Sequence, residues 1–356
     1  MRSLVLIAWL ALLTQLTACA AEECAAPLLR KCVVSLVSGD NYALGATVLA
    51  RSLRATESID NATRLVAIVP RGGLSETSMA WLKARGGFDI VHPPEYANDE
   101  VLGGMRKDLA SKRMAAAKLF AWTLEDCTRL LYMDSDSFAR FRVDFLDRDE
   151  YWTGNISGVQ EYDLARDEFK GGHLAIRPGR ATYDALMALL SSATNLTNSD
   201  QTLLNLAFKD EWQRKPVPER LPREGLLCSA YCVLVAYKPA QYTAIFNRML
   251  ASAAVVDFQG QSKPWNFPQP GAMAMRACEV LFPFVYAWVA LAVSADVHTA
   301  ALALSPSQFG KMQTVFDLVQ AAHTAFSTGD LVTKAYYQAV ARSVRNVVDL
   351  TQVFIA

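Results

Sequence analysis

RLLYMDSD (129–136) is the stretch that decides the fold. The apolar run RLLYM (129–133) is followed at once by three polar residues, Asp134, Ser135 and Asp136. A short apolar run that ends in polar residues is typical of a buried strand that stops at the edge of a sheet. In α/β sheets, ligands bind beyond the carboxyl ends of the strands. The stretch therefore predicts a central strand and, directly after it, a functional site.

Apolar runs and helical patterns alternate on both sides of this stretch. The sequence predicts further strands at 32–38, 64–69, 88–91 and 172–176. It predicts helices at 42–54, 75–85, 111–125 and 180–190, the second of them capped by Ser75. Buried runs that alternate with amphipathic helices indicate an α/β domain around a mostly parallel sheet.

The pattern changes after about residue 270. The stretch 280–293 is very apolar, and it fits either a short transmembrane helix or a buried helix. Its length and Pro283 favour the buried helix, and amphipathic helices are expected at 307–326 and 331–348. We therefore expect a catalytic domain over 28–270 and a helical extension over 271–356 that packs on it.

The composition is that of a folded protein without a charge bias. The 356 residues are 52% hydrophobic and carry 35 basic and 35 acidic side chains. A chain of this kind can bury a large core, which excludes intrinsic disorder. Zero net charge argues against a nucleic-acid binder, which needs a cationic excess.

The first twenty residues resemble a secretory signal peptide. A basic start is followed by an apolar run and by small residues at Ala18-Cys19-Ala20. We expect cleavage after Ala20 and a protein of the Golgi or ER lumen, or a secreted one. In the alternative reading Cys19 is the lipidated residue of a bacterial lipoprotein, anchored at the cell surface. Glycosylation sequons fit the secretory route weakly and lie at Asn61, Asn155 and Asn195.

Cleavage would remove one of the seven cysteines and leave six, which permits three disulfides in 15 pairings. Cys228 and Cys232 have no histidine near them, so buried thiols or disulfides are favoured there over a zinc site. The four histidines are isolated in the sequence, and we expect a structural role for each: His92, His173, His298 and His323.

The chemistry is expected where strands end. Asp134 and Asp136 are two residues apart, so in an extended segment both side chains point to the same face. Such a pair can converge on Mg²⁺ or Mn²⁺, with substrate phosphates completing the shell. Asp257 follows another apolar run and offers a third carboxylate, and Lys263 could neutralise a departing diphosphate.

Six blocks in this order resemble glycosyltransferase family 8, the glycogenin-like group, over about Cys32 to Phe267. The blocks are VSLVSGDNYALGATVLARSL (34–53), KLFAWTL (118–124), LLYMDSD (130–136), FKGGHLAIRP (169–178), SDQTLLN (199–205) and VVDFQGQSKPWNF (255–267). The resemblance implies a glycosyltransferase A fold, a single Rossmann-like α/β domain around a mixed sheet. It also implies a UDP-sugar donor, Mn²⁺ (or Mg²⁺) as cofactor, and transfer to a glycan or protein hydroxyl with retention of configuration.

The resemblance also assigns roles to residues. Metal ligands would be Asp134, Asp136 and Asp257. The nucleotide would lie against Leu36, Ser38 and Tyr42, with Ser135 beside the ribose. The remaining donor contacts would be Lys118, Lys170, Gly171, Gly172, Gly260 and Lys263. Asp200 and Gln201 would face the donor sugar near the anomeric carbon, and with Lys263 they form the expected catalytic set.

Two positions depart from the family pattern. Asp257 stands where the family normally has His, which adds a negative charge and favours oxygen-preferring metals. Lys170 stands where the family usually has Asn, so it could meet an anionic sugar such as a uronic acid, or could be a rim lysine without contact. Both departures leave a second interpretation open, a nucleotide-sugar-binding protein of the same fold with impaired catalysis. A homodimer is also compatible with the sequence.

Overall fold

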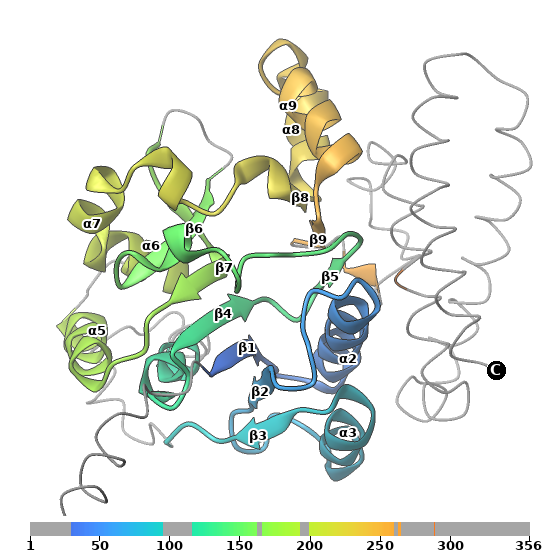
Figure 1. The fold of residues 1–356 in the computed structure, drawn as a ribbon, viewed down its shortest axis with the longest axis vertical. Helices are drawn as coiled ribbons and strands as arrows, with labels where there is room; N and C mark the ends of the chain where they lie inside the picture. The colour runs from blue at the N-terminus through green and yellow to red at the C-terminus, as the bar shows by residue number, and fades with distance from the viewer. Residues whose placement is uncertain are drawn as a thin grey trace, which may run out of the picture.

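The computed structural model describes residues 30–94, 116–161, 166–192, 199–259, 263–264 and 288. A six-stranded sheet forms its centre, in the order β3-β2-β1-β4-β7-β6 (Figure 1). The strands are β1 (Lys31–Leu36), β2 (Arg64–Ile68), β3 (Asp89–Val91), β4 (Arg129–Met133), β6 (Ile156–Gln160) and β7 (Phe169–Ile176). The strands β1 to β4 pair in parallel with their neighbours among these four, whereas β7 is antiparallel to both β4 and β6. The mixed α/β sheet is thus confirmed.

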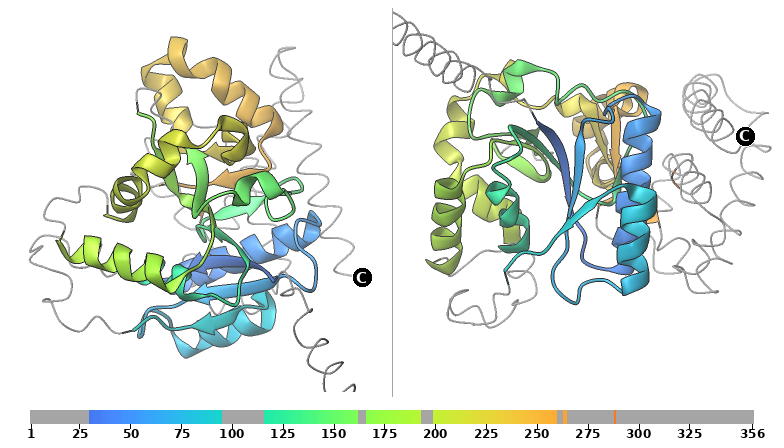
Figure 2. Two further views of the ribbon diagram at one scale, coloured as in Figure 1. Left: turned by 60° about the vertical axis from the view of Figure 1, so that its left-hand side comes forward. Right: turned by 60° about the horizontal axis from the view of Figure 1, so that its bottom comes forward.

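Each face of this sheet has its own hydrophobic core, because the strands are buried on both sides. In β1, Val33 belongs to one core, whereas Cys32 and Val34 belong to the other. The α2 helix (Asp40–Ala55) packs on the first face with α3 (Glu76–Trp81) beside it. The second face is covered by α5 (Arg180–Ser192), α6 (Ser199–Ala207) and α7 (Lys209–Arg214) (Figure 2).

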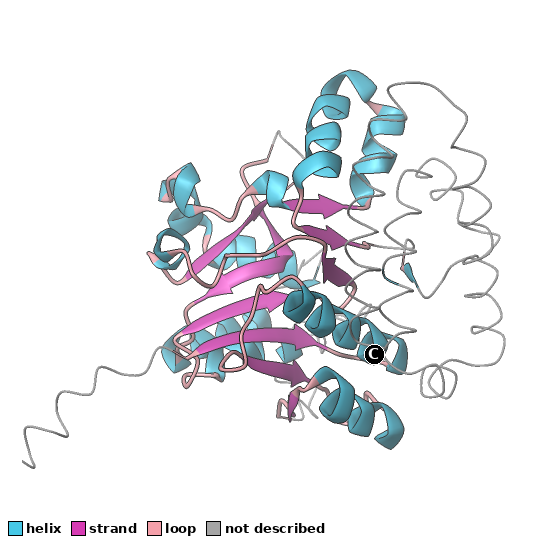
Figure 3. Ribbon diagram, turned by 45° about the vertical axis from the view of Figure 1, so that its right-hand side comes forward, coloured by secondary structure: helices cyan, strands magenta, loops and turns pink. Residues whose placement is uncertain are grey.

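A small second sheet lies beyond the carboxyl ends of the parallel strands of the main sheet. It has the order β5-β9-β8, formed by β5 (Ser137–Ala139), β8 (Leu226–Cys228) and β9 (Val255–Asp257). The α8 helix (Ala230–Tyr237) and the α9 helix (Pro239–Ser252) connect β8 to β9. The three short strands lie between the main sheet and these two helices (Figure 3). This sheet brings Asp257 next to the D-x-D segment, from which it is more than 100 residues away in sequence.

The helices expected at 42–54 and 180–190 are each one to two residues longer at an end, and the other two differ more. Ser75 caps α3 as expected, since its Oγ accepts a hydrogen bond from the Ser78 amide, but α-helix gives way to a π-helical turn at Leu82–Gly86. The helix expected over 111–125 is described only from residue 116 and ends in a 3-10 turn, Phe120–Thr123. Other 3-10 turns are Asp149–Trp152, Val217–Glu219 and Arg223–Gly225.

The cysteines do not all pair. A disulfide joins Cys32 in β1 to Cys127, just before β4, across a sequence separation of 95 residues. Cys232 is also disulfide-bonded, whereas Cys228 is a free, buried thiol. Three disulfides from six cysteines are therefore excluded, and the expectation of buried thiols or disulfides at 228 and 232 is confirmed.

Several expectations concern residues outside the described ranges: the signal peptide (1–20), the sequon at Asn195, Gly260 and, except for Trp288, the helical extension (271–356). Within the part of the chain that the structure describes, no helix combines the length and apolarity needed to cross a membrane.

Candidate active site

The D-x-D segment is fixed at the carboxyl edge of the sheet by hydrogen bonds to two neighbouring strands. The Asp134 amide donates to the Gly172 carbonyl of β7 at 2.9 Å. The Ser135 hydroxyl donates to the carbonyl of Leu36, the last residue of β1, at 3.2 Å. The ends of β1 and β4 and the first half of β7 thus converge on this segment, as the position after a buried strand predicts.

Asp134 is the more open of the two carboxylates, with 39% of its side chain exposed. Its Oδ1 accepts a hydrogen bond from the Tyr132 hydroxyl at 3.0 Å and lies 3.7 Å from the Lys118 ammonium. Tyr132 was not among the expected site residues. It lies two residues before Asp134, and this spacing on a strand places both side chains on one face.

Because Gly172 has no side chain, the Asp134 carboxylate can occupy the space beside it. A Cβ built at Gly172 would lie 2.4 Å from Oδ2 of Asp134, closer than two such atoms can approach. Replacing Gly172 by Ala should therefore displace the carboxylate and lower the turnover of this candidate site by about 10²-fold, the usual cost of a misplacement near 1 Å. Gly179→Ala is the matched control, since its Cβ would meet its nearest neighbour at an ordinary 3.8 Å. Equal rates in the two variants would contradict the argument.

The Lys118 ammonium lies between two carboxylates, those of Asp134 and Asp200. Its ammonium donates to Oδ2 of Asp200 at 2.5 Å and lies 4.4 Å from the centre of the Tyr132 ring. Burial lowers the pKa of Lys118, but Asp134 and Asp200 raise it above its ordinary value, so the side chain stays protonated. Lys118 thus keeps a positive charge between two acidic groups.

The α6 helix brings Gln201 to the start of β7. Gln201 Oε1 accepts a hydrogen bond from the Gly171 amide at 3.1 Å, and its Nε2 donates to the buried Glu161 at 2.5 Å. A Cβ at Gly171 would come within 3.3 Å of both Asp200 and Gln201. The side-chain amide of Gln201 is therefore held by hydrogen bonds at both its oxygen and its nitrogen. Glu161 is a further site residue that the sequence does not reveal.

Asp136 is buried, with only 5% of its surface exposed, and its Oδ2 forms an ion pair with Lys263. Its Oδ1 has no hydrogen-bond partner within the described residues. A buried carboxylate oxygen without a partner is costly unless something else binds it. The Lys263 ammonium also lies 5.8 Å from the centre of the Tyr42 ring, which connects this pair to α2.

Asp257 reaches the same place from β9. It pairs with Ser137 across β5 and β9, and the Ser137 hydroxyl donates to its Oδ1 at 3.3 Å. The amide of the next residue, Phe258, donates to the Asp136 carbonyl at 3.2 Å. The sequence-predicted carboxylates Asp134, Asp136 and Asp257 are thus brought to one end of the two sheets.

Lys170 lies in the interior, which corrects the alternative of a rim lysine without contact. Its ammonium donates to Cys228 Sγ at 3.1 Å and to Gln259 Oε1 at 3.3 Å. Burial lowers its pKa, but Cys228, Asp257 and Glu161 raise it well above its usual range. Burial raises the pKa of the Cys228 thiol to about 11, so the thiol stays protonated. A donor contact of Lys170 stays a prediction that this placement does not support.

The donor set suits a hard divalent cation, because carboxylate oxygens are the ligands that Mg²⁺ and Mn²⁺ prefer. The unpartnered Oδ1 of buried Asp136 is the structural sign of such a site. Among the described residues, however, no three His, Cys, Asp or Glu side chains are grouped closely enough to hold a metal ion as they stand. The metal ligands therefore remain a proposal.

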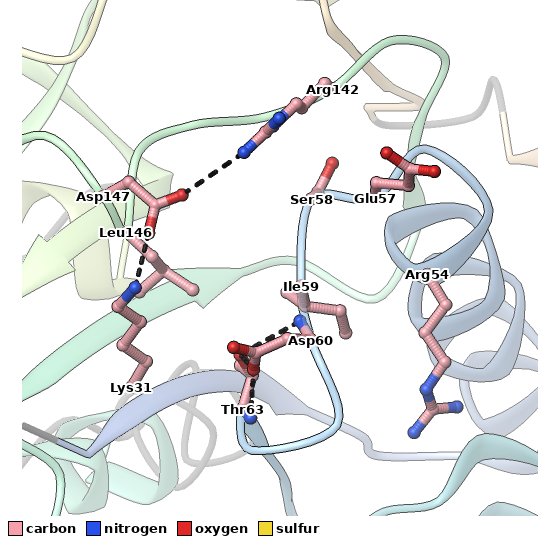
Figure 4. Close-up of a pocket in the computed structure, with 10 residues that line it drawn as sticks. All are labelled: Lys31, Arg54, Glu57, Ser58, Ile59, Asp60, Thr63, Arg142, Leu146 and Asp147. Carbon is pink, nitrogen blue, oxygen red and sulfur yellow. Dashed lines mark hydrogen bonds and ion pairs between the residues drawn. The ribbon is translucent and has the colours of Figure 1, made fainter.

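Leu36, Ser38 and Tyr42 are partly buried at the end of β1 and the start of α2, on the same side of the sheet as the carboxylates. A separate cavity of about 320 Å³ lies at the opposite ends of β1 and β2 and is lined by Lys31, Asp60, Thr63 and Asp147 among others (Figure 4). Within this cavity Lys31 forms an ion pair with Asp147, and the Thr63 amide donates to Asp60. It holds none of the expected site residues.

No protein-family model matches the chain. A solved structure of the galactosyltransferase LgtC with donor and acceptor sugar analogues aligns with 19% identity and a TM-score of 0.48, covering 74% of this chain and 95% of that one. Among sequence relatives, glycogenin-1 of Oryctolagus cuniculus is 27% identical over 286 residues, 79% of each chain. An inositol phosphorylceramide glucuronosyltransferase of Arabidopsis thaliana is 23% identical over 181 residues, 50% of this chain and 30% of the relative.

Human glycogenin-2 is 28% identical over 250 residues, which are 67% of this chain and 45% of the relative. With the α/β sheet and the acidic groups at its carboxyl edge, these sequence relatives define the protein as a glycosyltransferase. Its resemblance to the glycogenin-like family 8 is confirmed by the same relatives. The Rossmann-like fold class that the family implies is confirmed as well.

Proposed function

We propose that the protein is a metal-dependent, retaining glycosyltransferase that moves a hexose or a uronic acid from a UDP-sugar to a glycan or protein hydroxyl. The observation that carries this proposal is the buried carboxylate of Asp136, with one oxygen unpartnered and the other paired to Lys263. An acidic centre of this kind repels a diphosphate by itself and can bind one only with added positive charge.

Asp134, Asp136 and Asp257 would hold Mn²⁺ or Mg²⁺, which when bound would offset the negative charge of the donor diphosphate. Lys263 would bind the diphosphate and stabilise the charge that develops on it as it departs. Lys118 would hold Asp200 in place through their 2.5 Å contact. Gln201, fixed between Gly171 and Glu161, would orient the donor sugar next to Asp200.

The nucleotide would lie against Leu36, Ser38 and Tyr42, with Ser135 beside the ribose. Gly171 and Gly172 would contact the donor through their backbone, since the places their side chains would take are filled by Asp200, Gln201 and Asp134. Gly260 would contribute to the diphosphate site. Lys170 does not favour a uronic acid over a hexose, because its ammonium is bonded inside the protein.

A donor screen tests the proposal. UDP-hexoses and UDP-uronic acids would be incubated with the full chain and Mn²⁺, Mg²⁺ or EDTA, and release of UDP would be measured. We expect metal-dependent turnover of at least one donor, since hydrolysis by water usually accompanies transfer. Equal turnover with EDTA would contradict the metal role, and absence of turnover with every donor would contradict catalysis.

The second candidate is a nucleotide-sugar-binding protein with impaired catalysis. It is favoured by one observation, the lack of a ready three-ligand metal group among the described residues. Calorimetry separates the two, because binding of UDP or a UDP-sugar without turnover of any donor would support the binding protein.

We also propose that the protein works in the secretory pathway or is secreted. The Cys32–Cys127 disulfide supports an oxidising compartment. Mass spectrometry of the mature N-terminus distinguishes cleavage after Ala20 from lipidation at Cys19. Sedimentation of the purified protein would show whether it forms the homodimer.

A further inference from the structure

The sequence predicts an isolated, structural role for His173. In the structure, however, its buried imidazole belongs to a group of hydrogen-bonded side chains. His173 lies on β7, one residue after Gly172, and is 1% exposed. Its Nε2 lies 3.1 Å from the Ser137 hydroxyl oxygen. That same hydroxyl donates to Oδ1 of Asp257 at 3.3 Å. Ser137 therefore stands between the imidazole and the carboxylate.

The direction of the hydrogen bonds follows from the number of protons. The Ser137 hydroxyl has one proton, which it donates to Oδ1 of Asp257. Ser137 must then accept from His173, which requires a proton on Nε2. The other ring nitrogen, Nδ1, has no partner within the described residues and would be the unprotonated one. Leaving a lone pair without a partner costs less here than burying an unpaired N–H group.

The surroundings agree with a neutral imidazole. Burial lowers the pKa of His173, while the charged groups that face it partly cancel: Asp257 and Asp134 raise the pKa, and Lys170 and Lys118 lower it. The imidazole thus serves as a hydrogen-bond donor of fixed direction, and it carries no charge that would oppose a cation nearby.

Asp257 is held from its other side as well. Cys228 pairs with Asp257 across β8 and β9, and Lys170 contacts both Cys228 and Gln259, two residues beyond Asp257. The Ser229 amide donates to the Asp257 carbonyl at 2.8 Å. The backbone of Asp257 is therefore fixed by the small sheet, which leaves the orientation of its carboxylate to Ser137.

We propose that His173 and Ser137 are positioning residues that aim the Asp257 carboxylate at the cation site through the relay His173 Nε2–H to Ser137 Oγ–H to Asp257 Oδ1. The inference rests on the proposed metal-dependent function and deepens it. Outer groups that orient a metal ligand typically contribute 10–100-fold to metal affinity. The relay thus assigns part of the metal affinity to two residues that touch neither the metal nor the donor.

Mn²⁺ binding to the full chain in the presence of UDP tests the relay, with free Mn²⁺ followed by electron paramagnetic resonance. Ser137→Ala and His173→Leu should each weaken Mn²⁺ binding by about 10–100-fold. His173→Gln should restore most of the affinity, because its amide nitrogen can replace Nε2 as a donor to Ser137. Ser157→Ala is the matched control: this buried hydroxyl has two backbone partners, Glu219 and Leu221, and lies away from the site.

Unchanged Mn²⁺ affinity in Ser137→Ala and His173→Leu, with tight binding by the wild type, would overturn the relay and leave the proposed function intact. If the wild type itself takes up no Mn²⁺ with UDP, the metal role fails and the relay with it. Nitrogen-15 NMR of the unmodified protein gives a check that does not depend on variants. The relay requires the Nε2–H tautomer of His173 at neutral pH, and an Nδ1–H tautomer would overturn it.

Discussion

Asp136→Asn should lower glycosyl transfer by at least about 10²–10³-fold, the usual loss when one preorganised charge-stabilising group is removed. The variant keeps the shape of the side chain but removes its negative charge. The unpartnered oxygen of Asp136 then no longer attracts a cation, and Lys263 loses its counterion. Transfer rate and Mn²⁺ affinity would be measured together, and both should fall.

Asp147→Asn provides a matched control for this change. Asp147 also forms an ion pair with a lysine, Lys31, but at the opposite end of the main sheet (Figure 4). Its loss should leave transfer within experimental error of the wild type. Thermal melting of both variants separates an effect on the site from an effect on folding. A folded Asp136→Asn variant with wild-type activity would contradict the assignment of the D-x-D segment.

The sequence was sufficient for the features that depend on local pattern. The strand before Asp134, the helix after β1 and the Ser75 cap all follow from short-range periodicity and capping, and the structure has each of them. Asp134 and Asp136 could be found for the same reason, because they directly follow a buried strand.

Features that depend on long-range pairing were not predictable in the same way. The small sheet joins three-residue strands from 137, 226 and 255, and such short strands carry too little pattern to be recognised. The contacts between this small sheet and β7 are therefore not visible in the sequence, which shows neither the bond of His173 to Ser137 nor that of Lys170 to Cys228. Glu161 was missed because its partner Gln201 is 40 residues away.

The departure at Lys170 shows how the fold changes the meaning of a residue. In sequence, a lysine near the donor-sugar block suggests contact with an anionic sugar. In the structure its ammonium is enclosed, and its contacts, Cys228 and Gln259, flank Asp257 in the small sheet. A buried cation beside an added carboxylate lowers the cost of burying that carboxylate. The two departures from the family pattern, Lys170 and Asp257, are thus close in space and opposite in charge.

Lys263→Met should change metal binding and transfer in opposite directions. The Lys263 ammonium pairs with Asp136 where the proposed cation would bind, so ammonium and metal compete for the same carboxylate. Without the ammonium, Mn²⁺ should bind the donor-free protein about tenfold more tightly, the equivalent of about 1.4 kcal/mol. Transfer should nevertheless fall by about 10²-fold, because the departing diphosphate loses a stabilising charge.

Mn²⁺ titration without nucleotide and the transfer rate at saturating Mn²⁺ and donor measure the two effects separately. Lys83→Met, at an exposed position in the turn after α3, is the control and should change neither. If Lys263→Met binds Mn²⁺ no more tightly than the wild type, the ammonium does not compete for Asp136. If transfer is unchanged, Lys263 does not stabilise the leaving group. If Lys263 only supported the fold, its replacement would lower both the Mn²⁺ affinity and the transfer rate. A higher Mn²⁺ affinity together with a lower transfer rate therefore identifies a lysine that moves from Asp136 to the diphosphate when the metal and the donor bind.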